Sequence, residues 1–483
     1  MVLAAVLAAS LVAGSAAAAH PAASGVSART ASSSAPISCP PGRYRVRAGD
    51  TLYSIARRFH SSVAALARAN ALDPNDILLA GAILKVPSAP CEARRSGPSD
   101  AGEQGGTLAV SLKRAVTVPG VSRARTGVVV VDLDSNSVIY ALNRELPLEP
   151  ASTEKLPVAL TALQRLGGGF RTHTDVLVQG SLVRGTLRGK LVLKGYGDPT
   201  LTSTGLAALA RAVRVRGITG VSGGVVGDES YFDDLRTCPG WKASFAKNES
   251  PLLSALVVDR GVLDGAATDR PALAAAILFT RALQKAGVSV GGRPAVGSAT
   301  STAVELVRRT SPPLTSLLSV MDTWSDNFVA EMLLKQLGAQ LAGRGSTGAG
   351  AAVVSATLAA DDVPLAGVHI ADGSGLSSLN RLTARSLAAM LETLWHEPDL
   401  RALLNTFAVA GSTGTLRHRL LSVRGRDLIR GKTGTTDDSS ALAGFVGSRF
   451  AFAVVNNGSP VNWQAAHLVQ DRVASALLAE VAA

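Results

Sequence analysis

The sequence predicts a multidomain protein in which a small βααβ module precedes a larger domain of mixed α/β or α+β architecture. Three observations predict this. At 483 residues the chain is too long for one ordinary hydrophobic core. Two stretches rich in Ala, Ser, Gly and Pro, at residues 26–42 and 89–125, separate segments that have regular hydrophobic patterns. From residue 126 to the C-terminus, strand pairs alternate with helical patterns.

The composition is that of a folded protein. Hydrophobic residues make up 47% of the chain and charged residues 17%, which excludes an intrinsically disordered chain. The formal net charge of +12 suits acidic partners such as nucleic acid, lipid headgroups or wall polymers, although diffuse basicity more often serves solubility. There is no dense run of Lys and Arg, and aromatic residues are scarce at 4%, so we expect no nucleic-acid partner.

Residues 1–25 have the pattern of a secretory signal peptide. Met1 to Val12 is almost continuous Ala, Leu and Val, and small residues follow through Ala19. No basic residue precedes the apolar run, so either translation starts further upstream or the signal is atypical. No other stretch is apolar for the length of a membrane span, so we expect no permanent membrane helix. The sequence therefore predicts a secreted, extracytoplasmic protein.

Residues 43–88 form the small module. A short alternating strand is followed by a turn, and Asp50 or Thr51 can cap the helix that comes next. Apolar residues at i, i+3, i+4 and i+7 spacing then predict that helix, and a second helix and a closing strand complete the unit. The expected elements are a strand at 44–47, a helix through Leu52, Ile55, Ala56 and Phe59, a helix at 63–69 and a strand at 82–87.

The three cysteines are Cys39, Cys91 and Cys238. Export would place them in an oxidising compartment, and a module of this size is marginally stable without a covalent link. Because Cys39 and Cys91 flank the module, we expect them to form a disulfide that pins its two ends. Cys238 is then either buried and reduced or a free thiol. The spacing does not suit zinc and the histidines do not cluster, so we predict no metal and no cofactor.

The module resembles a LysM domain. The resemblance rests on Tyr44-x-Val46-x-x-Gly49-Asp50-Thr51-Leu52-x-x-Ile55-Ala56, then Leu66, Asn70, Gly81-x-x-Leu84 and Val86-Pro87. It implies binding to the N-acetylglucosamine of peptidoglycan or chitin, along the loop after the first strand and the loop before the second. The residues implied as glycan contacts are Gly49, Asp50, Thr51 and Asn70. Alternatively, Gly49 and Asp50 only make the turn and the helix cap.

Three short motifs that carry chemistry follow in order. They are Ser152-Thr153-Glu154-Lys155, Ser325-Asp326-Asn327 and Lys432-Thr433-Gly434-Thr435. On a helix, residues i and i+3 face the same way, so Lys155 can lie over the hydroxyl of Ser152. A serine hydroxyl becomes a good nucleophile only when a base takes its proton. Lysine can act as that base where burial or neighbouring positive charge lowers its pKa.

Each motif alone occurs often by chance, but together they resemble the serine–lysine set of penicillin-binding proteins and class A β-lactamases. The 169 residues between Lys155 and Ser325 exceed what a β-lactamase inserts there. This spacing is similar to that of the low-molecular-mass class C penicillin-binding proteins, the D-Ala-D-Ala carboxypeptidase/endopeptidase family. The resemblance implies a serine β-lactamase/transpeptidase-like catalytic domain at 126–483, with a large insertion at about 175–295. Further matching segments lie at 195–201, 227–232, 257–260, 372–377 and 414–417.

The resemblance also implies the roles of individual residues. Ser152 is the acylated nucleophile and Lys155 is its base. Ser325 relays a proton to the leaving amine, and Asn327 holds the peptide amide of the substrate. Lys432 raises the positive potential, and the oxyanion hole consists of the backbone N–H groups of Ser152 and Thr435. The residues implied in substrate binding are Thr433, Gly434, Thr435 and Asp228, the last either as a contact to the diamino acid or only as a turn residue.

The expected function is that of a serine-type D-alanyl-D-alanine carboxypeptidase/endopeptidase. It would act on peptidoglycan stem peptides through an acyl-serine intermediate, be inhibited by β-lactams and be anchored on glycan by the LysM module. One alternative is a peptidoglycan-binding scaffold with a degenerate catalytic domain, which the three intact motifs argue against. Another is a β-lactamase, which the long insertion and the missing Glu-x-x-Leu-Asn segment argue against.

Overall fold

The computed structural model describes residues 42–46, 52, 55–56, 59, 63–72, 78, 81–86 and 107–482. Several predictions fall outside these residues. They are the signal peptide, the disulfide between Cys39 and Cys91, and the glycan contacts at Gly49, Asp50 and Thr51.

The N-terminal module has two antiparallel strands and a helix. Strand β1 (Gly42–Arg45) pairs with β2 (Ile83–Val86) so that Tyr44 lies opposite Leu84. Helix α2 (Val63–Asn70) follows a helical stretch that includes Leu52, Ile55 and Ala56. The buried side chains of this small core are Val46, Leu52, Ile55, Ala56, Leu66, Ala67, Leu84 and Val86.

The centre of the larger domain is a six-stranded antiparallel sheet. Its strand order is β14-β15-β16-β17-β3-β4, so the C-terminal strands pair with the strands that begin the domain. This order places the Lys432 motif, on β15, inside the sheet and not at its edge. The strands are β3 (Thr126–Asp132), β4 (Ser137–Leu142), β14 (Ala408–Val409), β15 (Ile429–Thr435), β16 (Ser439–Val446) and β17 (Phe450–Asn457).

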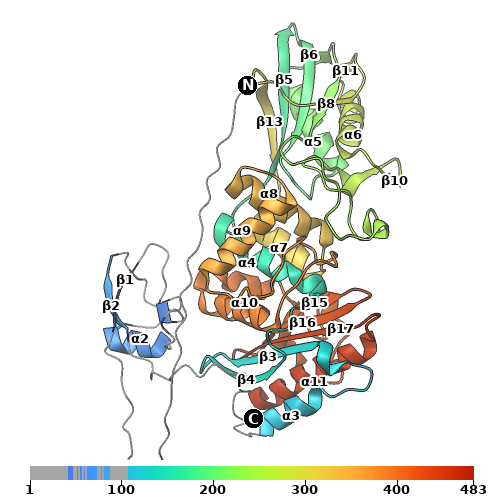
Figure 1. Cartoon of the computed structure of the whole chain (residues 1–483). Helices are drawn as coiled ribbons and strands as arrows, with labels where there is room; N and C mark the ends of the chain where they lie inside the picture. The colour runs from blue at the N-terminus through green and yellow to red at the C-terminus, as the bar shows by residue number, and fades with distance from the viewer. Residues whose placement is uncertain are drawn as a thin grey trace, which may run out of the picture.

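Both faces of this sheet are covered by helices, which explains its continuous apolar strands. On β3, Val128 and Val130 face a core shared with α3 (Thr107–Ala115) and α11 (Trp463–Ala482). Val129 and Val131 alternate to the other face, against a helical layer (Figure 1). The helices of that layer are α4 (Lys155–Leu166), α7 (Leu314–Thr323), α8 (Asn327–Ala342), α9 (Thr347–Ala360) and α10 (Ala384–His396).

A second sheet lies between α4 and α7 in the chain and extends from the opposite side of the helical layer (Figure 1). Its long hairpin, β5 (His173–Val183) and β6 (Thr186–Gly195), pairs with β13 (Val304–Thr310) on one side. Helices α5 (Ser203–Val215) and α6 (Pro271–Lys285) pack on this sheet around Phe279 and Leu283. The remaining strands are β7 (Gly220–Val221), β8 (Val225–Asp228), β11 (Ser289–Val290) and β12 (Ala295–Val296).

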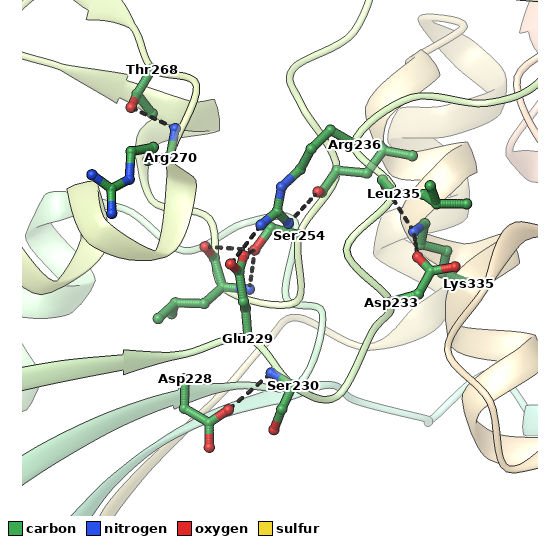
Figure 2. Close-up of polar contacts among 12 residues, drawn as sticks. Asp228, Glu229, Ser230, Asp233, Leu235, Arg236, Ser254, Thr268, Arg270 and Lys335 are labelled. Atoms are coloured by element: carbon green, nitrogen blue, oxygen red, sulfur yellow. Dashed lines mark hydrogen bonds and ion pairs between the residues drawn. The ribbon is translucent and has the colours of Figure 1, made fainter. Parts of the chain in front are cut away.

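The loop after β8 joins this inserted sheet to helix α8 (Figure 2). The buried ammonium of Lys335, on α8, pairs with Asp233 and donates to the Leu235 carbonyl at 2.9 Å. Earlier in the loop, Glu229 pairs with Arg236 and accepts from the Ser254 hydroxyl. Helix α8 begins with Asn327, a residue of the second motif. The bonds to Lys335 therefore join the inserted sheet to a helix that carries a motif residue.

Pro157 and Cys238 have local environments that the fold explains. Pro157 lies in the first turn of α4, where a missing backbone N–H costs no helical hydrogen bond. Cys238 is buried and unpaired, which decides between the two states left open for it. Among the residues that the structure describes, no helix has both the length and the apolar character needed to cross a bilayer.

Candidate active site

Ser152 and Lys155 meet at the junction of a 3₁₀ turn and helix α4. The turn, Ala151–Glu154, places residues i and i+3 almost in line, so the Lys155 ammonium donates to the Ser152 hydroxyl at 3.0 Å. Ala151 has a φ of 46°, a left-handed conformation that costs energy for a residue with a side chain. The sequence therefore folds locally so that the serine lies directly before the helix that carries the lysine.

The surroundings of Lys155 set its basicity. Its Nζ also donates to the Asn327 Oδ1 at 2.8 Å and to the Ser374 carbonyl at 2.5 Å. The side chain is fully buried, and this desolvation lowers its pKa from 10.5 to about 8. The nearby carboxylates, led by Asp372 and Glu331, favour the charged form and limit the fall. A substantial fraction of this lysine is therefore neutral slightly above neutral pH and able to accept a proton.

The second motif lies at the start of helix α8. The helix begins at Asn327, the last residue of the motif. Ser325 lies outside the helix because it has a left-handed φ of 61°. Asp326 caps the helix by accepting from the Val329 N–H at 2.9 Å. This cap directs the Asn327 side chain to Lys155, while Ser325 bonds to a different lysine.

The third motif lies on strand β15. The fully buried Lys432 ammonium donates to the Ser325 hydroxyl at 2.8 Å and to the Thr433 carbonyl at 2.8 Å. Burial and the positive charge of Lys155 hold the pKa of Lys432 well below its usual value, and the carboxyl of Asp322 opposes this. The two lysines are thus electrostatically coupled, and the three motifs, far apart in sequence, share one buried polar centre.

Strand β15 passes very close to Ser152. A Cβ added at Gly434 would lie 2.9 Å from the backbone nitrogen of Ser152 and 2.7 Å from the Pro150 carbonyl. Only glycine fits such a backbone approach. Thr435, the next residue on β15, is exposed, and the Thr433 hydroxyl donates to that of Thr415 at 2.7 Å. This places the strand bearing the proposed oxyanion donor Thr435 beside the serine.

The carbonyl that Lys155 meets belongs to a loop organised by Asp372. The Asp372 carboxylate accepts from the backbone N–H groups of Gly375 at 2.8 Å and Ser377 at 2.7 Å. It also accepts from the Trp241 indole at 2.8 Å. These bonds turn the Ser374 carbonyl toward Lys155. In the sequence this segment indicates only a family resemblance, and no pattern assigns a role to its residues.

Glu331 is a further buried acid next to Lys155 that the motifs did not indicate. It lies one turn after Asn327 on α8 and accepts from the backbone N–H groups of Gly373 and Ser374. Burial raises its pKa from 4.5 to about 7, and the neighbouring Asp372 adds to the rise. Cys238 donates to it at 3.2 Å. The i+4 spacing from Asn327 is the one signal in the sequence that could have identified Glu331 as a neighbour of the site.

Two other buried acids surround the lysines. Asp322, at the end of α7, accepts from the Thr406 hydroxyl at 2.7 Å, and burial raises its pKa to about 7. Glu154, inside the first motif, is fully buried, and neither of its carboxyl oxygens has a hydrogen-bond partner. Burial and the acids Asp372 and Glu331 hold the pKa of Glu154 well above its usual value of 4.5, which favours the protonated carboxyl.

A segment of the inserted region, residues 239–250, lies against the same centre. The Glu249 carbonyl accepts from the Asn327 Nδ2 at 3.0 Å. Lys242 forms an exposed ion pair with Asp437, which follows the third motif, at 2.6 Å. Together with the bond from Trp241 to Asp372, these contacts make the inserted region a wall of the site.

Two other residues from the sequence analysis have purely internal contacts. Asp228, at the end of β8, is fully buried and accepts from the Ser230 and Ala299 N–H groups, with Lys194 3.5 Å away (Figure 2). The Asn70 side chain joins α2 to β2 by bonds to Leu66 and Lys85. The structure thus brings the three motifs together and places Asp228 in a separate hydrogen-bond network of the inserted sheet.

Both the N-terminal module and the larger domain match known family models. Residues 44–87 match the LysM domain, and residues 108–272 and 263–479 match the D-Ala-D-Ala carboxypeptidase 3 (S13) family. The chain is 28% identical over 486 residues to a D-alanyl-D-alanine carboxypeptidase of an Actinomadura strain, covering 82% of this chain and 89% of that relative.

Solved structures show the same fold. Penicillin-binding protein 4 (DacB) of Haemophilus influenzae superposes with a TM-score of 0.69 at 23% identity, over 77% of this chain and 99% of that one. The same protein in complex with a β-lactam superposes with a TM-score of 0.64 at 25% identity, over the same shares. These matches confirm the LysM and penicillin-binding resemblances and the fold class expected from the sequence.

Proposed function

Because the chain belongs to the D-Ala-D-Ala carboxypeptidase 3 (S13) family, we propose that it cleaves the terminal D-Ala-D-Ala bond of peptidoglycan stem peptides through an acyl intermediate on Ser152. The enzyme class follows from the family, and the assignment of the serine and its partners is the proposal. Its main support is that the Lys155 ammonium, fully buried and with a pKa of about 8, contacts the Ser152 hydroxyl at 3.0 Å.

The first step is acylation. Neutral Lys155 takes the Ser152 proton as the oxygen attacks the carbonyl carbon of the penultimate D-Ala. The backbone N–H groups of Ser152 and Thr435 stabilise the oxyanion, an effect worth about 3 kcal/mol where water is excluded. Collapse of the intermediate breaks the C–N bond, and the Ser325 hydroxyl passes a proton to the leaving D-Ala.

Substrate binding before acylation needs a carboxylate-binding group, and deacylation needs water. Lys432, which donates to Ser325, supplies positive charge for the terminal carboxylate of the substrate, together with Thr433 and Thr435. The Asn327 amide, which also contacts the Glu249 carbonyl, is placed to meet the substrate's peptide group. Water then hydrolyses the acyl-Ser152 ester, and the proton returns to the serine oxygen.

A penicillin would acylate the same serine. The relative from Haemophilus influenzae has been solved in complex with a β-lactam, which supports this proposal. We expect Ser152→Ala to lose both labelling by a fluorescent penicillin and hydrolysis of a diacyl-Lys-D-Ala-D-Ala tripeptide, with a fall of about 10⁴-fold or more. Ser181→Ala, on exposed β5 surface, is the matched control and should retain both. Labelling of folded Ser152→Ala protein would refute the assignment.

We also propose that the enzyme acts outside the cytoplasm and that the LysM module anchors it on glycan. The match of residues 44–87 to the LysM family supports this. Deleting residues 1–106 should leave tripeptide hydrolysis unchanged and reduce co-sedimentation with insoluble peptidoglycan. Equal co-sedimentation of the two proteins would contradict the anchoring role.

The balance between the two peptidase activities depends on how substrate enters beside the segment 239–250. We propose that the enzyme acts as a carboxypeptidase and also as an endopeptidase on cross-linked peptides. Mass spectrometry of purified muropeptides after incubation distinguishes the two activities. Loss of one D-Ala reports carboxypeptidase activity, and cleavage of dimers reports endopeptidase activity.

A further inference from the structure

Basic and acidic residues are distributed unevenly along the inserted sheet. Three of its segments, residues 176–197, 199–227 and 282–304, contain nine basic residues and no acidic residue. One of the nine, Lys194, lies near the base of β6 and pairs with Asp228. The other eight define what we call the basic tip: Arg184, Arg188, Lys190, Arg211, Arg214, Arg216, Lys285 and Arg293.

The residues of the basic tip are all exposed and all without a charge partner. In the region that the structure describes, none of the eight forms an ion pair or a side-chain hydrogen bond. Most of the basic residues nearer the catalytic domain behave differently, because they meet a carboxylate. These pairs include Arg236–Glu229, Arg260–Asp326, Arg281–Asp264, Arg308–Asp175 and Arg309–Asp198. Charge is thus neutralised at the base of the inserted sheet and left uncompensated at its far end.

Hydrogen bonds bring the turns of the basic tip together. The two-residue turn Arg184-Gly185 joins β5 to β6, and the Gly185 carbonyl accepts from the Thr219 N–H at 2.7 Å. Thr219 follows the end of α5, and its own carbonyl accepts from the Ser289 N–H at 3.0 Å, after the end of α6. The basic residues on these three turns therefore lie at one end of the molecule, where the β5–β6 hairpin projects (Figure 1).

Apolar side chains are exposed among these charges. Leu182 and Val183, directly before the hairpin turn, are 51% and 39% exposed. Val215, between Arg214 and Arg216, is 85% exposed. Apolar side chains beside basic residues are the combination that binds an anionic bilayer, by apolar insertion together with charge attraction. A soluble polyanion would be held by the arginines alone and gives no reason for these three side chains.

We propose that the basic tip is a membrane-docking surface, which binds anionic phospholipid headgroups while Leu182, Val183 and Val215 insert into the boundary with the acyl chains. Basic residues near an anionic bilayer each contribute to binding, and neighbouring apolar residues add to it by entering the interface. Strand β5 is 11 residues long, so the tip lies roughly 35 Å from the base of the hairpin. The enzyme would then contact the membrane with its inserted sheet while its catalytic centre faces the wall.

Vesicle binding by the full chain tests this proposal. We expect binding to vesicles of phosphatidylglycerol and phosphatidylcholine to exceed binding to phosphatidylcholine alone by about tenfold or more, and to weaken as salt is raised. The measured quantity is the ratio of binding to the anionic vesicles over binding to the phosphatidylcholine vesicles. The ratio is used because the apolar N-terminal stretch carries no charged side chain and contributes to binding of both kinds of vesicle. The quadruple variant R184E/R188E/R214E/R216E should reduce this ratio to near one.

A matched control changes the same charge elsewhere. Arg114, Arg123, Arg424 and Arg472 are exposed on the catalytic domain, and R114E/R123E/R424E/R472E should keep the ratio of the wild type. Circular dichroism and tripeptide hydrolysis should be unchanged in both variants, because none of these residues touches the catalytic centre. A ratio near one for the wild type, or equal losses in the two variants, would overturn the proposal.

The apolar residues distinguish a membrane from a soluble polyanion. The variant L182S/V183S/V215S should bind anionic vesicles at least about fivefold more weakly, while its binding to soluble polyphosphate stays that of the wild type. If this variant binds vesicles normally, and the arginine variant loses binding to polyphosphate, the partner is a polyanion and the membrane proposal is wrong.

Discussion

The reactivity of Ser152 depends on a lysine whose surroundings act on its pKa in opposite directions. Burial of Lys155 favours its neutral form, while the carboxylates of Asp372 and Glu331 favour its charged form. The result is a pKa of about 8, close to the pH at which a general base is most effective. Neither extreme would serve, because an exposed lysine stays protonated and an isolated buried one would be a weak base.

This balance predicts the pH dependence of acylation. The neutral fraction of Lys155 grows as pH rises through about 8, so the rate of penicillin acylation should increase with pH and level off above that value. Stopped-flow measurement of fluorescent penicillin labelling, corrected for hydrolysis by buffer, gives the profile. A rate that is independent of pH between about 6 and 9 would argue against Lys155 as the base.

Glu154 is a second residue with an unusual environment, since its buried carboxyl has no hydrogen-bond partner. We expect Glu154→Met, which has a similar volume, to stabilise the fold by about 1–3 kcal/mol by removing an unsatisfied polar group. Urea denaturation measures the free energy of unfolding.

The gain from Glu154→Met should depend on pH. Below 4.5 the carboxyl is protonated in the folded and unfolded chains, and its ionisation affects neither. As pH rises above 4.5 the unfolded chain ionises before the folded chain does, because the folded pKa is raised, so the wild type loses stability while the variant does not. A gain that is constant from acid to neutral pH would show that Glu154 does not stay protonated in the folded state.

Among the secondary-structure elements, the contact between strand β15 and the 3₁₀ turn at Ala151–Glu154 decides the geometry. A Cβ at Gly434 would lie within 3 Å of the Ser152 nitrogen and the Pro150 carbonyl, both backbone atoms that cannot move independently. The strand must therefore keep glycine here to hold the proposed oxyanion donors at the serine.

We expect Gly434→Ala to reduce kcat/KM for the tripeptide by about 10²-fold or more, because β15 must move away from Ser152. Gly169→Ala is a suitable control, since a Cβ there meets no atom within 4 Å, and its activity should be that of the wild type. Full activity of Gly434→Ala would mean that the position of β15 is not critical.

For the molecule as a whole, one of the contacts that couple the inserted sheet to the catalytic helices is a buried charge. The Lys335 side chain is 0% exposed and pairs with Asp233, which is 28% exposed. Removing the acid leaves a buried ammonium without its partner, whereas removing the lysine leaves an acid that water can reach.

This asymmetry predicts that Asp233→Asn costs about 3 kcal/mol of unfolding free energy and that Lys335→Met costs less. Asp234→Asn, a neighbouring exposed position, should be neutral within about 0.5 kcal/mol. Urea denaturation of the three variants provides the comparison. Equal costs for Asp233→Asn and Lys335→Met would indicate that the pair contributes only packing.

Much of this architecture could be predicted from the sequence. The strand pairs expected from residue 126 onward are present, beginning with the antiparallel pair of β3 and β4. The two family resemblances and the fold class are confirmed by the comparisons. The start of α8 at Asn327 could not be predicted, since helical periodicity does not reveal the left-handed φ of Ser325.

By itself the sequence determined which modules are present, their order and the three motifs, because hydrophobic period and short motif spacing are local properties of the chain. Only the tertiary structure decided what surrounds Lys155. The Ser374 carbonyl that it meets lies 219 residues away in the chain, and the acids Glu331 and Asp372 carry no motif that relates them to it. The pKa of a buried group depends on burial and on charges brought near by folding, and no local pattern records either of these.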